Sequence, residues 1–288
     1  MFGFLNVYKP SGLTSHDVVA KLRKILKIKQ IGHTGTLDPM AEGVLVVAVG
    51  KASRLIEFLD EDKSYRVTLQ LGKISDTFDI EGQVEDYSDK KIFEDELLKS
   101  LQNFQGEILQ TPPAFSAVHY NGKRLYELAR QGIIPEDIPK RKVFISKIEL
   151  VSFNFDNQVA VLDIDCSKGT YIRSIVSDLG QMLECGAVMT ALTRTKSGSF
   201  NIKDAVKLDV VSSVDSAISL LRNTLSVLPF NKYLLSDVEY KKVVQGQALF
   251  VSDFEKDEYV SLVFEEKLCA VAQKTDESRL AVKKVFVQ

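Results

Sequence analysis

Hydrophobic and polar residues alternate along this chain with two different periods, and the shorter one predicts strands. In residues 64–71 (SYRVTLQL) every second residue is apolar, and Tyr65 belongs to the apolar set. This pattern predicts a half-buried strand with Tyr65 on its inner face. The continuous apolar run at 44–49 (VLVVAV) predicts a buried strand. Two further strands are expected at 143–151 and 159–166.

The longer period, of 3.6 residues, predicts helices. Apolar residues recur at helical spacing in segment 18–26, with Ser15 as the expected N-cap. The basic residues of segment 21–29 (KLRKILKIK) lie mostly off the apolar stripe, so this helix should have a basic outer face. Two further helices are expected at 91–103 and 171–184.

The distribution of these elements divides the chain into two parts. Residues 1–226 mix helices with strands, whereas residues 227–288 have the pattern of short strands separated by turns. Strands of this second part are expected at 243–250, 258–264, 267–273 and 280–287. We therefore expect a large mixed domain followed by a small β domain.

Two connections in the first part differ from ordinary loops. Residues 75–89 (SDTFDIEGQVEDYSD) are acidic, and their spacing does not match a calcium-binding loop, so a solvated loop is expected. Residues 111–142 contain four of the seven prolines around a short helix-like stretch. A connection this long inside a compact domain is usually a functional arm. Its mixture of aromatic, basic and small residues suits an element that grips RNA.

Composition indicates a globular protein. Hydrophobic residues make up 45% of the 288 and charged residues 26%, and no apolar run is long enough for a transmembrane helix. The first residues, MFGFLNVYKPSG, lack the basic region of a secretory signal. Three widely spaced cysteines form neither a disulfide framework nor a zinc motif, so a reducing compartment, the cytoplasm, is expected.

The net charge of −2 is not the overall signature of a nucleic-acid-binding protein. Phosphates respond to the local surface, however, because screening limits electrostatic interactions to about 8 Å. Basic residues cluster at 21–29 and 140–142, and Lys123 and Arg124 form a pair. Each cluster is also compatible with an ordinary solvated helix face or loop.

The first candidate for chemistry is the segment 32–45 (GHTGTLDPMAEGVL). Its glycines allow backbone conformations closed to other residues, and Pro39 keeps Asp38 out of the helical region. The segment should be a rigid, irregular loop that holds one carboxylate in a fixed place before a buried strand. Such a carboxylate can serve as a nucleophile or an acid–base group. The alternative is a plain turn whose carboxylate satisfies local N–H groups, with His33 as a structural histidine.

The second candidate is the segment 166–180 (CSKGTYIRSIVSDLG), in which a strand turns into a helix. Arg173 lies in the first turn of that helix, where the helix dipole disfavours a cation. A buried carboxylate partner would explain the position of Arg173. A solvated arginine is the alternative. Phosphate-loop, nucleophile-elbow and metal-site motifs are absent from the sequence.

These two segments and several others together resemble the bacterial TruB family of tRNA pseudouridine-55 synthases. The resemblance covers nearly all of residues 4–226. The matching blocks are NVYKPSGLTSHDVV (6–19), GHTGTLDPMAEGVLVVAVGKASRL (32–55), KSYRVTLQLG (63–72), QTPPAFSAVHYNGKRLYELARQG (110–132), DCSKGTYIRSIVSDLG (165–180) and LTRTKSGSF (192–200). The tail is similar to a short PUA RNA-binding domain, chiefly in its strand rhythm.

The resemblance implies the isomerisation of a uridine in the T arm of tRNA. The ribose–N1 bond is broken and remade to C5, so no cofactor and no metal is needed. Asp38 occupies the position of the catalytic aspartate, Arg173 that of the arginine that pairs with it, and Tyr65 that of a tyrosine packed on the target uracil. Leu192 matches an apolar residue of the base pocket. Attack of Asp38 at C1′, attack at C6 and a glycal route all stay open.

The resemblance also implies contacts to RNA. The target base must be flipped out of the folded T loop, and His33 matches the histidine that fills the vacated place. The arm at 111–142 would close over the RNA, and in one position, His119, the family commonly carries lysine. The other residues implied to contact substrate or RNA are Gly35, Thr36, Lys168, Lys123, Arg124, Lys140 and Arg141.

The fold implied is α+β, with a mixed, largely antiparallel sheet, flanking helices and a small C-terminal PUA-like β domain. The presence of the arm and the start of the chain near the first block favour a stand-alone enzyme without guide RNA, and nothing suggests an obligate dimer or a membrane. A protein that only binds or folds tRNA is the rival interpretation. The presence of Asp38, Tyr65 and Arg173 speaks against it, because binding alone does not require this carboxylate.

Overall fold

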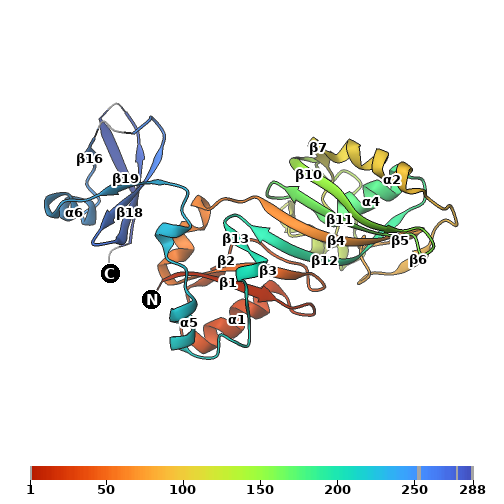
Figure 1. Ribbon diagram of the computed structural model, residues 1–288, viewed down its shortest axis with the longest axis horizontal. Coiled ribbons are helices and arrows are strands. Elements are labelled where there is room, and N and C mark those ends of the chain that lie inside the picture. The colour runs from red at the N-terminus through yellow and green to blue at the C-terminus, as the bar shows by residue number, and fades with distance from the viewer. Residues whose placement is uncertain (1, 252–253, 277, 287–288) are drawn as a thin grey trace.

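Two β-sheets organise the computed structural model, which describes residues 2–251, 254–276 and 278–286 (Figure 1). The large sheet has ten strands, eight of which follow one another in the order β14-β1-β3-β12-β4-β11-β10-β7, while β13 pairs with β12 and β2 with β3. Its strands are β1 (Gly3–Lys9), β2 (Ile31–His33), β3 (Glu42–Val49), β4 (Lys63–Leu71), β7 (Gly106–Gln110), β10 (Arg141–Asn154), β11 (Val159–Cys166), β12 (Ala187–Ser197), β13 (Phe200–Asn201) and β14 (Val206–Lys207). Among the described strands of this sheet, only the β1–β14 and β3–β12 pairs are parallel. The predicted mixed, largely antiparallel sheet is confirmed.

The strands follow the predicted hydrophobic pattern. All of β3 after its first residue is buried, as its continuous apolar run requires. In β4 the alternation places Tyr65, Val67, Leu69 and Leu71 inside, and Tyr65 is 8% exposed. The pairing of β4 with β12 on one side and β11 on the other makes it a central strand.

Helices cover the sheet in two groups. The helix α4 (Ile172–Met182) packs on the central strands together with α2 (Glu94–Leu101), and α1 (Ser15–Leu26) packs on β1 and β3 with α5 (Val214–Leu220). Figure 1 shows these two groups at different ends of the large sheet. Short 3-10 helices complete this domain at Gly50–Phe58 (η1), Gln102–Phe104 (η2), Ile202–Asp204 (η3) and Thr224–Ser226 (η4).

The start of α1 corrects one prediction. Thr14, not Ser15, is the N-cap: its side chain accepts from the Asp17 N–H, and Asp17 bonds back to Thr14 in a capping box. Ser15 is instead buried inside the first turn. The basic residues of segment 21–29 are exposed along the outer face of the helix, as predicted.

The acidic segment 75–89 is more ordered than predicted. It begins at the last residue of β5 (Lys73–Ser75) and contains β6 (Val84–Asp86), which pairs with β5, and its middle docks on the large sheet. The Ile80 N–H donates to the Met189 carbonyl at 3.1 Å, and the Met189 N–H donates to the Phe78 carbonyl at 3.0 Å. Asp79 is consequently only 2% exposed, so the prediction of a solvated loop is wrong at this residue.

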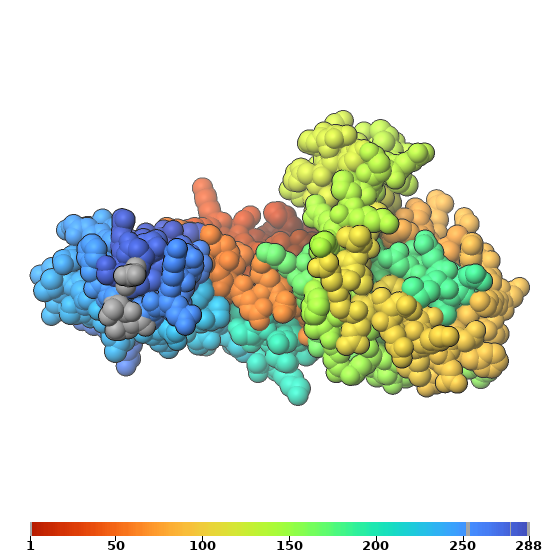
Figure 2. All heavy atoms as spheres, turned by 90° about the horizontal axis from the view of Figure 1, so that it is seen from above, coloured from red at the N-terminus to blue at the C-terminus, as the bar shows by residue number. Residues whose placement is uncertain are grey.

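The arm at 111–142 stands out from the body as a separate lobe, yellow-green in Figure 2. It contains a small hairpin, β8 (His119–Tyr120) and β9 (Lys123–Arg124), and the one-turn helix α3 (Leu125–Ala129). The backbones of Gln110 and Arg141 pair across β7 and β10. This pair closes the base of the arm.

The C-terminal part forms a five-stranded sheet in the order β15-β17-β18-β19-β16. The strands are β15 (Asn231–Leu234), β16 (Leu249–Phe250), β17 (Tyr259–Phe264), β18 (Lys267–Lys274) and β19 (Arg279–Val285), accompanied by α6 (Asp237–Val244). The strand predicted at 243–250 is wrong in its first half, because Val243 and Val244 end α6. The strand predicted at 280–287 runs into residue 287, which lies outside the described residues. The boundary at 226–227 stays a prediction.

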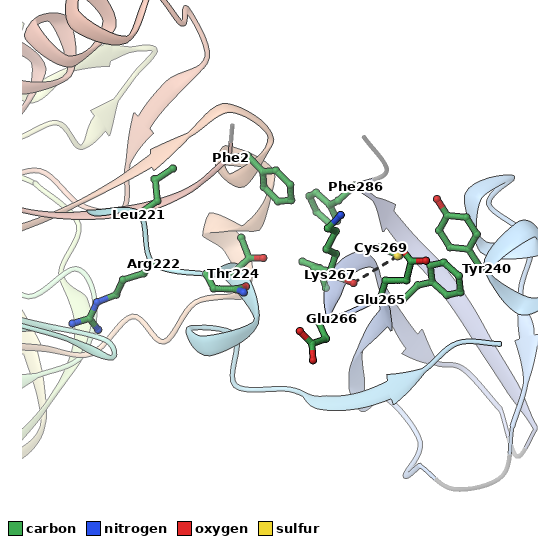
Figure 3. A pocket seen from close by; sticks show the side chains of 13 residues that line it. Phe2, Leu221, Arg222, Thr224, Tyr240, Glu265, Glu266, Lys267, Cys269 and Phe286 are labelled. Carbon is green, nitrogen blue, oxygen red and sulfur yellow. Dashed lines mark hydrogen bonds between the residues drawn. The ribbon is translucent and has the colours of Figure 1, made fainter. Parts of the chain in front are cut away.

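The two sheets meet through a shared apolar cluster. Leu268, Val271 and Phe286 of the C-terminal part pack with Phe4 and Phe200 of the large domain. A cavity of about 360 Å³ lies at this junction, with Phe2 and Thr224 on the side of the large domain and Glu266, Lys267 and Phe286 on the side of the C-terminal sheet (Figure 3). None of the residues that line it is among the predicted site residues. Among the described residues, no helix has the length and apolarity needed to cross a membrane.

Candidate active site

The loop between β2 and β3 carries Asp38, and a buried arginine holds this loop from inside. Arg194 of β12 is 0% exposed; its Nη2 donates to the Gly35 carbonyl at 3.0 Å and its Nη1 to the Thr36 carbonyl at 3.2 Å. Its Nε donates to the Val44 carbonyl at 2.7 Å. The loop is thereby fixed to the sheet just before Asp38.

The close approach of Arg194 explains one glycine of the sequence block. Gly43 has φ +103°, and a Cβ there would lie 2.3 Å from the Arg194 carbonyl oxygen. No side chain can be accommodated at that distance, and the positive φ is itself unfavourable for other residues. Gly43 therefore lets β3 and β12 meet behind the Asp38 loop.

Both chain neighbours of Asp38 are anchored to the first helix and its preceding turn. The Leu37 N–H donates to Ser15 Oγ at 2.8 Å, and Ser15 Oγ donates to the Leu37 carbonyl at 3.2 Å. Lys9 Nζ donates to the Pro39 carbonyl at 3.1 Å and to two carbonyls of the turn at 10–13. Burial lowers the pKa of Lys9 to about 8. The backbone on both sides of Asp38 is thus held in place, as predicted from its sequence block.

Asp38 and Arg173 meet across this site. Arg173 Nη2 donates to Asp38 Oδ1 at 3.2 Å, and Arg173 Nε lies 3.0 Å from Asp38 Oδ2. The side chain of Arg173 is 7% exposed and that of Asp38 is 32% exposed. Arg173 therefore has the carboxylate partner that its helix position required, and the solvated alternative is wrong. Asp38 keeps part of its carboxylate open to the outside.

A second carboxylate, from Asp79, lies on the other side of the same guanidinium. Arg173 Nη1 is 3.4 Å from Asp79 Oδ2 and donates to the Thr77 carbonyl at 3.1 Å. Asp79 Oδ1 accepts from Thr77 Oγ1 at 2.6 Å and from the Glu81 N–H at 3.0 Å. Burial, followed by the charge of Asp79, raises the pKa of Glu81. Asp79 holds the guanidinium at its far edge and faces away from solvent.

Asp79 is the residue that sequence reasoning missed. The segment contains several aspartates, and nothing in its spacing distinguishes Asp79 from exposed Asp76. Only the pairing of residues 78–80 with β12, a contact between distant parts of the chain, buries Asp79. The sequence contained only indirect signals for Asp79. Arg173 was expected to need a buried carboxylate partner, and the acidic segment had no other role.

Tyr65 and Leu192 contribute apolar surface next to the loop. Both belong to the same core cluster as Leu37, and they lie on the adjacent strands β4 and β12. Burial raises the pKa of Tyr65, and the nearby charge of Arg194 opposes this less strongly. A neutral phenol and an apolar wall therefore lie beside the loop that carries Asp38.

His33 ends β2 and begins the loop. Burial, and after it the charge of Arg194, lower the pKa of His33, so the imidazole is neutral at pH 7. Its Nδ1 is buried without a hydrogen-bond partner among the described residues. Gly35 is constrained by Lys63, whose Cε would lie 3.2 Å from a Cβ at that position, and Thr36 is exposed.

The predicted basic residues are exposed and lie on different elements. Lys168, in the turn between β11 and α4, forms an ion pair with Glu61. Lys123 and Arg124 form the second strand of the arm's hairpin, and Lys140 and Arg141 lie at the arm's return to the sheet. Their contact with RNA stays a prediction. In the described part of the chain, no group of three His, Cys, Asp or Glu side chains is placed to hold a metal ion.

Two protein-family models match consecutive parts of the chain. Residues 23–172 match a model described as the N-terminal domain of the TruB family pseudouridylate synthases. Residues 173–233 match a model described as the C-terminal domain of tRNA pseudouridylate synthase B. The first match contains the Asp38 loop, and the second begins at Arg173.

Curated relatives share much of the sequence. A protein of Clostridium acetobutylicum named tRNA pseudouridine synthase B is 47% identical over 85% of this chain and 84% of its own. A protein of the same name from Clostridium perfringens is 40% identical over 90% of this chain and 96% of its own. Among solved structures, an archaeal box H/ACA Nop10–Cbf5 complex contains a chain of the same fold, 24% identical over 99% of this chain and 86% of that one, with a TM-score of 0.73.

Proposed function

Because the chain belongs to the TruB family of pseudouridylate synthases, and is itself a tRNA pseudouridine synthase, we propose that it acts on uridine 55 in the T arm of tRNA. The reaction breaks the C1′–N1 bond and forms a C1′–C5 bond. A proton leaves C5 and a proton is gained at N1, so atoms and oxidation state are unchanged.

The pair of Asp38 and Arg173 is the observation that carries this proposal. The 3.0 Å and 3.2 Å approaches orient the carboxylate, and its exposed fraction leaves it accessible to a nucleoside. Arg173 cannot lose its charge and is held by Asp79 on its far side. Asp38 then attacks C1′, attacks C6 or removes a ribose proton toward a glycal. Each of these steps needs an ionised carboxylate in a fixed position.

We assign the uracil to the apolar side of the site. Tyr65 packs against the base, and Leu192 forms part of the wall around it. Tyr65 assists removal of the C5 proton, which leaves to water. Both residues belong to the same core cluster as Leu37, which immediately precedes Asp38, and this supports the assignment.

The uridine reaches this site by base flipping, which costs a few kcal/mol of unstacking. His33 enters the vacated place, and its neutral state lets the ring stack without carrying a charge into the RNA. The exposed cations of α1, of β9 and of the end of the arm contact phosphates, and the C-terminal sheet extends this surface as a PUA-like domain. The protein acts as a monomer, and no guide RNA is needed.

Mapping of the modified position tests this proposal. A tRNA transcript and a U55C transcript are incubated with the protein, and pseudouridine is located by carbodiimide treatment and primer extension. We expect one stop, at position 55, in the first transcript only. A stop elsewhere with position 55 unmodified would contradict the proposed target.

A further inference from the structure

Gln110 joins the arm to the helix that presents Arg173. It is the last residue of β7, directly before the arm, and it is 1% exposed. Its Oε1 accepts from the Tyr171 N–H at 2.7 Å, and its Nε2 donates to the Tyr171 carbonyl at 3.0 Å. A buried amide side chain thus satisfies both backbone groups of a single residue.

Tyr171 directly precedes α4. It occupies the N-cap position, and its own side chain makes no capping hydrogen bond. Its carbonyl also accepts from the Ile175 N–H of the first turn, at 3.2 Å. The clamp from Gln110 therefore fixes both the place and the direction in which α4 starts, and Arg173 follows two residues later.

The next residues of the arm hold the same turn of helix. Ser174 Oγ donates to the Thr111 carbonyl at 2.9 Å, and Arg173 Nη2 donates to the Phe115 carbonyl at 3.0 Å. A guanidinium that touches Asp38 on one edge is thus supported by the root of the arm on another. The root of the arm and the Arg173–Asp38 pair are therefore joined by direct hydrogen bonds.

We propose that Gln110 is a positioning residue for the reaction: it sets the orientation of Arg173 and couples the arm to the Asp38 carboxylate. This inference rests on the proposed function of Asp38 and Arg173. A displacement of about 1 Å at a catalytic group can slow a reaction by about 100-fold. Loss of the clamp should therefore slow chemistry while the RNA-binding surface stays intact.

The chain contains a matched control. Gln158 is also buried, at 5% exposed, and clamps both backbone groups of Ile92: Oε1 accepts from its N–H at 2.8 Å and Nε2 donates to its carbonyl at 3.2 Å. Ile92 precedes α2, which does not carry a candidate site residue. A purely structural role for Gln110 predicts that the two glutamines behave alike.

The test compares Gln110→Met, which keeps the side-chain length without the amide, with Gln158→Met and wild type. Single-turnover pseudouridine formation, Kd for tRNA and the unfolding temperature are measured for each. For Gln110→Met we expect a rate loss of about ten-fold or more with Kd within about three-fold, and for Gln158→Met a rate within about two-fold of wild type. Ser174→Ala, a milder change at the same joint, should give a smaller rate loss and decides the question if Gln110→Met does not fold.

Three results would overturn the inference. Equal rate losses for Gln110→Met and Gln158→Met would show a structural role. A weaker affinity for tRNA with an unchanged rate would show that Gln110 supports RNA binding by the arm. Unchanged rates in both Gln110→Met and Ser174→Ala would also reject it. A wild-type protein that forms no pseudouridine would instead reject the proposed function, so the two failures are distinguishable.

Discussion

Arg173 approaches Asp38 with two nitrogens, Nη2 at 3.2 Å from Oδ1 and Nε at 3.0 Å from Oδ2, from a position almost without solvent contact. The arginine is the buried partner and the aspartate the accessible one. This asymmetry suits a carboxylate that works on a substrate while its counter-ion stays in place. It also determines which substitutions should stop the chemistry without abolishing RNA binding.

Arg173→Lys should slow the reaction even though it keeps the charge. A lysine ammonium is a point charge and cannot reproduce the planar contacts that Arg173 makes with Asp38 and with the carbonyls of Thr77 and Phe115. We expect the single-turnover rate to fall by about 100-fold or more with little change in Kd for tRNA. Wild-type kinetics in this variant would show that the charge alone is sufficient.

Asp79→Asn should reduce activity although Asp79 faces away from solvent. The amide keeps the shape but removes the second negative charge beside Arg173, so the guanidinium is free to shift from its position against Asp38. We expect a rate loss of about 10- to 100-fold, measured at saturating tRNA. Asp76→Asn, an exposed change in the same segment, is the control and should stay within about two-fold of wild type.

The buried state of His33 predicts a pH dependence of stability. The pKa of His33 is lowered in the folded protein, so the unfolded chain binds more protons as the pH falls below about 6.5. The stability that the folded protein derives from neutral His33 is therefore present at neutral pH and is lost on acidification. Compared with His33→Gln, wild type should therefore lose more of its free energy of unfolding between pH 7.5 and pH 5, as measured by urea denaturation. Parallel curves for the two proteins would contradict it.

Neutralising the basic residues of the arm should weaken RNA binding in a salt-dependent way. Each phosphate contact that is lost reduces the slope of log Kd against log salt by about 1. We expect this for the pairs Lys123→Gln/Arg124→Gln and Lys140→Gln/Arg141→Gln, with the rate at saturating tRNA nearly unchanged. Lys99→Gln on α2 removes one positive charge outside the arm and serves as a control for the loss of charge itself. An unaltered salt slope in both pairs would mean that the arm does not hold phosphates.

Local pattern predicted the elements that carry the site. Alternation in 64–71 placed Tyr65 inside, and the glycines and Pro39 of 32–45 indicated a rigid loop around Asp38. The unfavourable helix position of Arg173 indicated a buried acidic partner, and the structure contains one in Asp79, next to the more accessible Asp38. Each of these inferences used residues close together in the chain, where spacing alone restricts the geometry.

Contacts between distant segments were beyond such reasoning. Arg194 looks like an ordinary polar position of a strand, yet it is fully buried, holds the Asp38 loop through two carbonyls and bonds to a third in β3. Ser15 satisfied the pattern of an N-cap but bonds to Leu37 instead, because β2 and its loop pack on α1. Asp79 and Gln110 could not be identified for the same reason, since the assembled sheet determines which polar side chains are buried.

Release of tritium from a T-arm RNA that contains 5-tritiated uridine tests the central claim most directly. Wild type and Asp38→Asn are compared in EDTA, with RNA binding measured on the same samples. We expect wild type to release tritium into water and Asp38→Asn to release none while it still binds the RNA. Release by Asp38→Asn at the wild-type rate would contradict the assignment of Asp38, and tight binding without release by wild type would indicate a protein that binds this RNA without isomerising it.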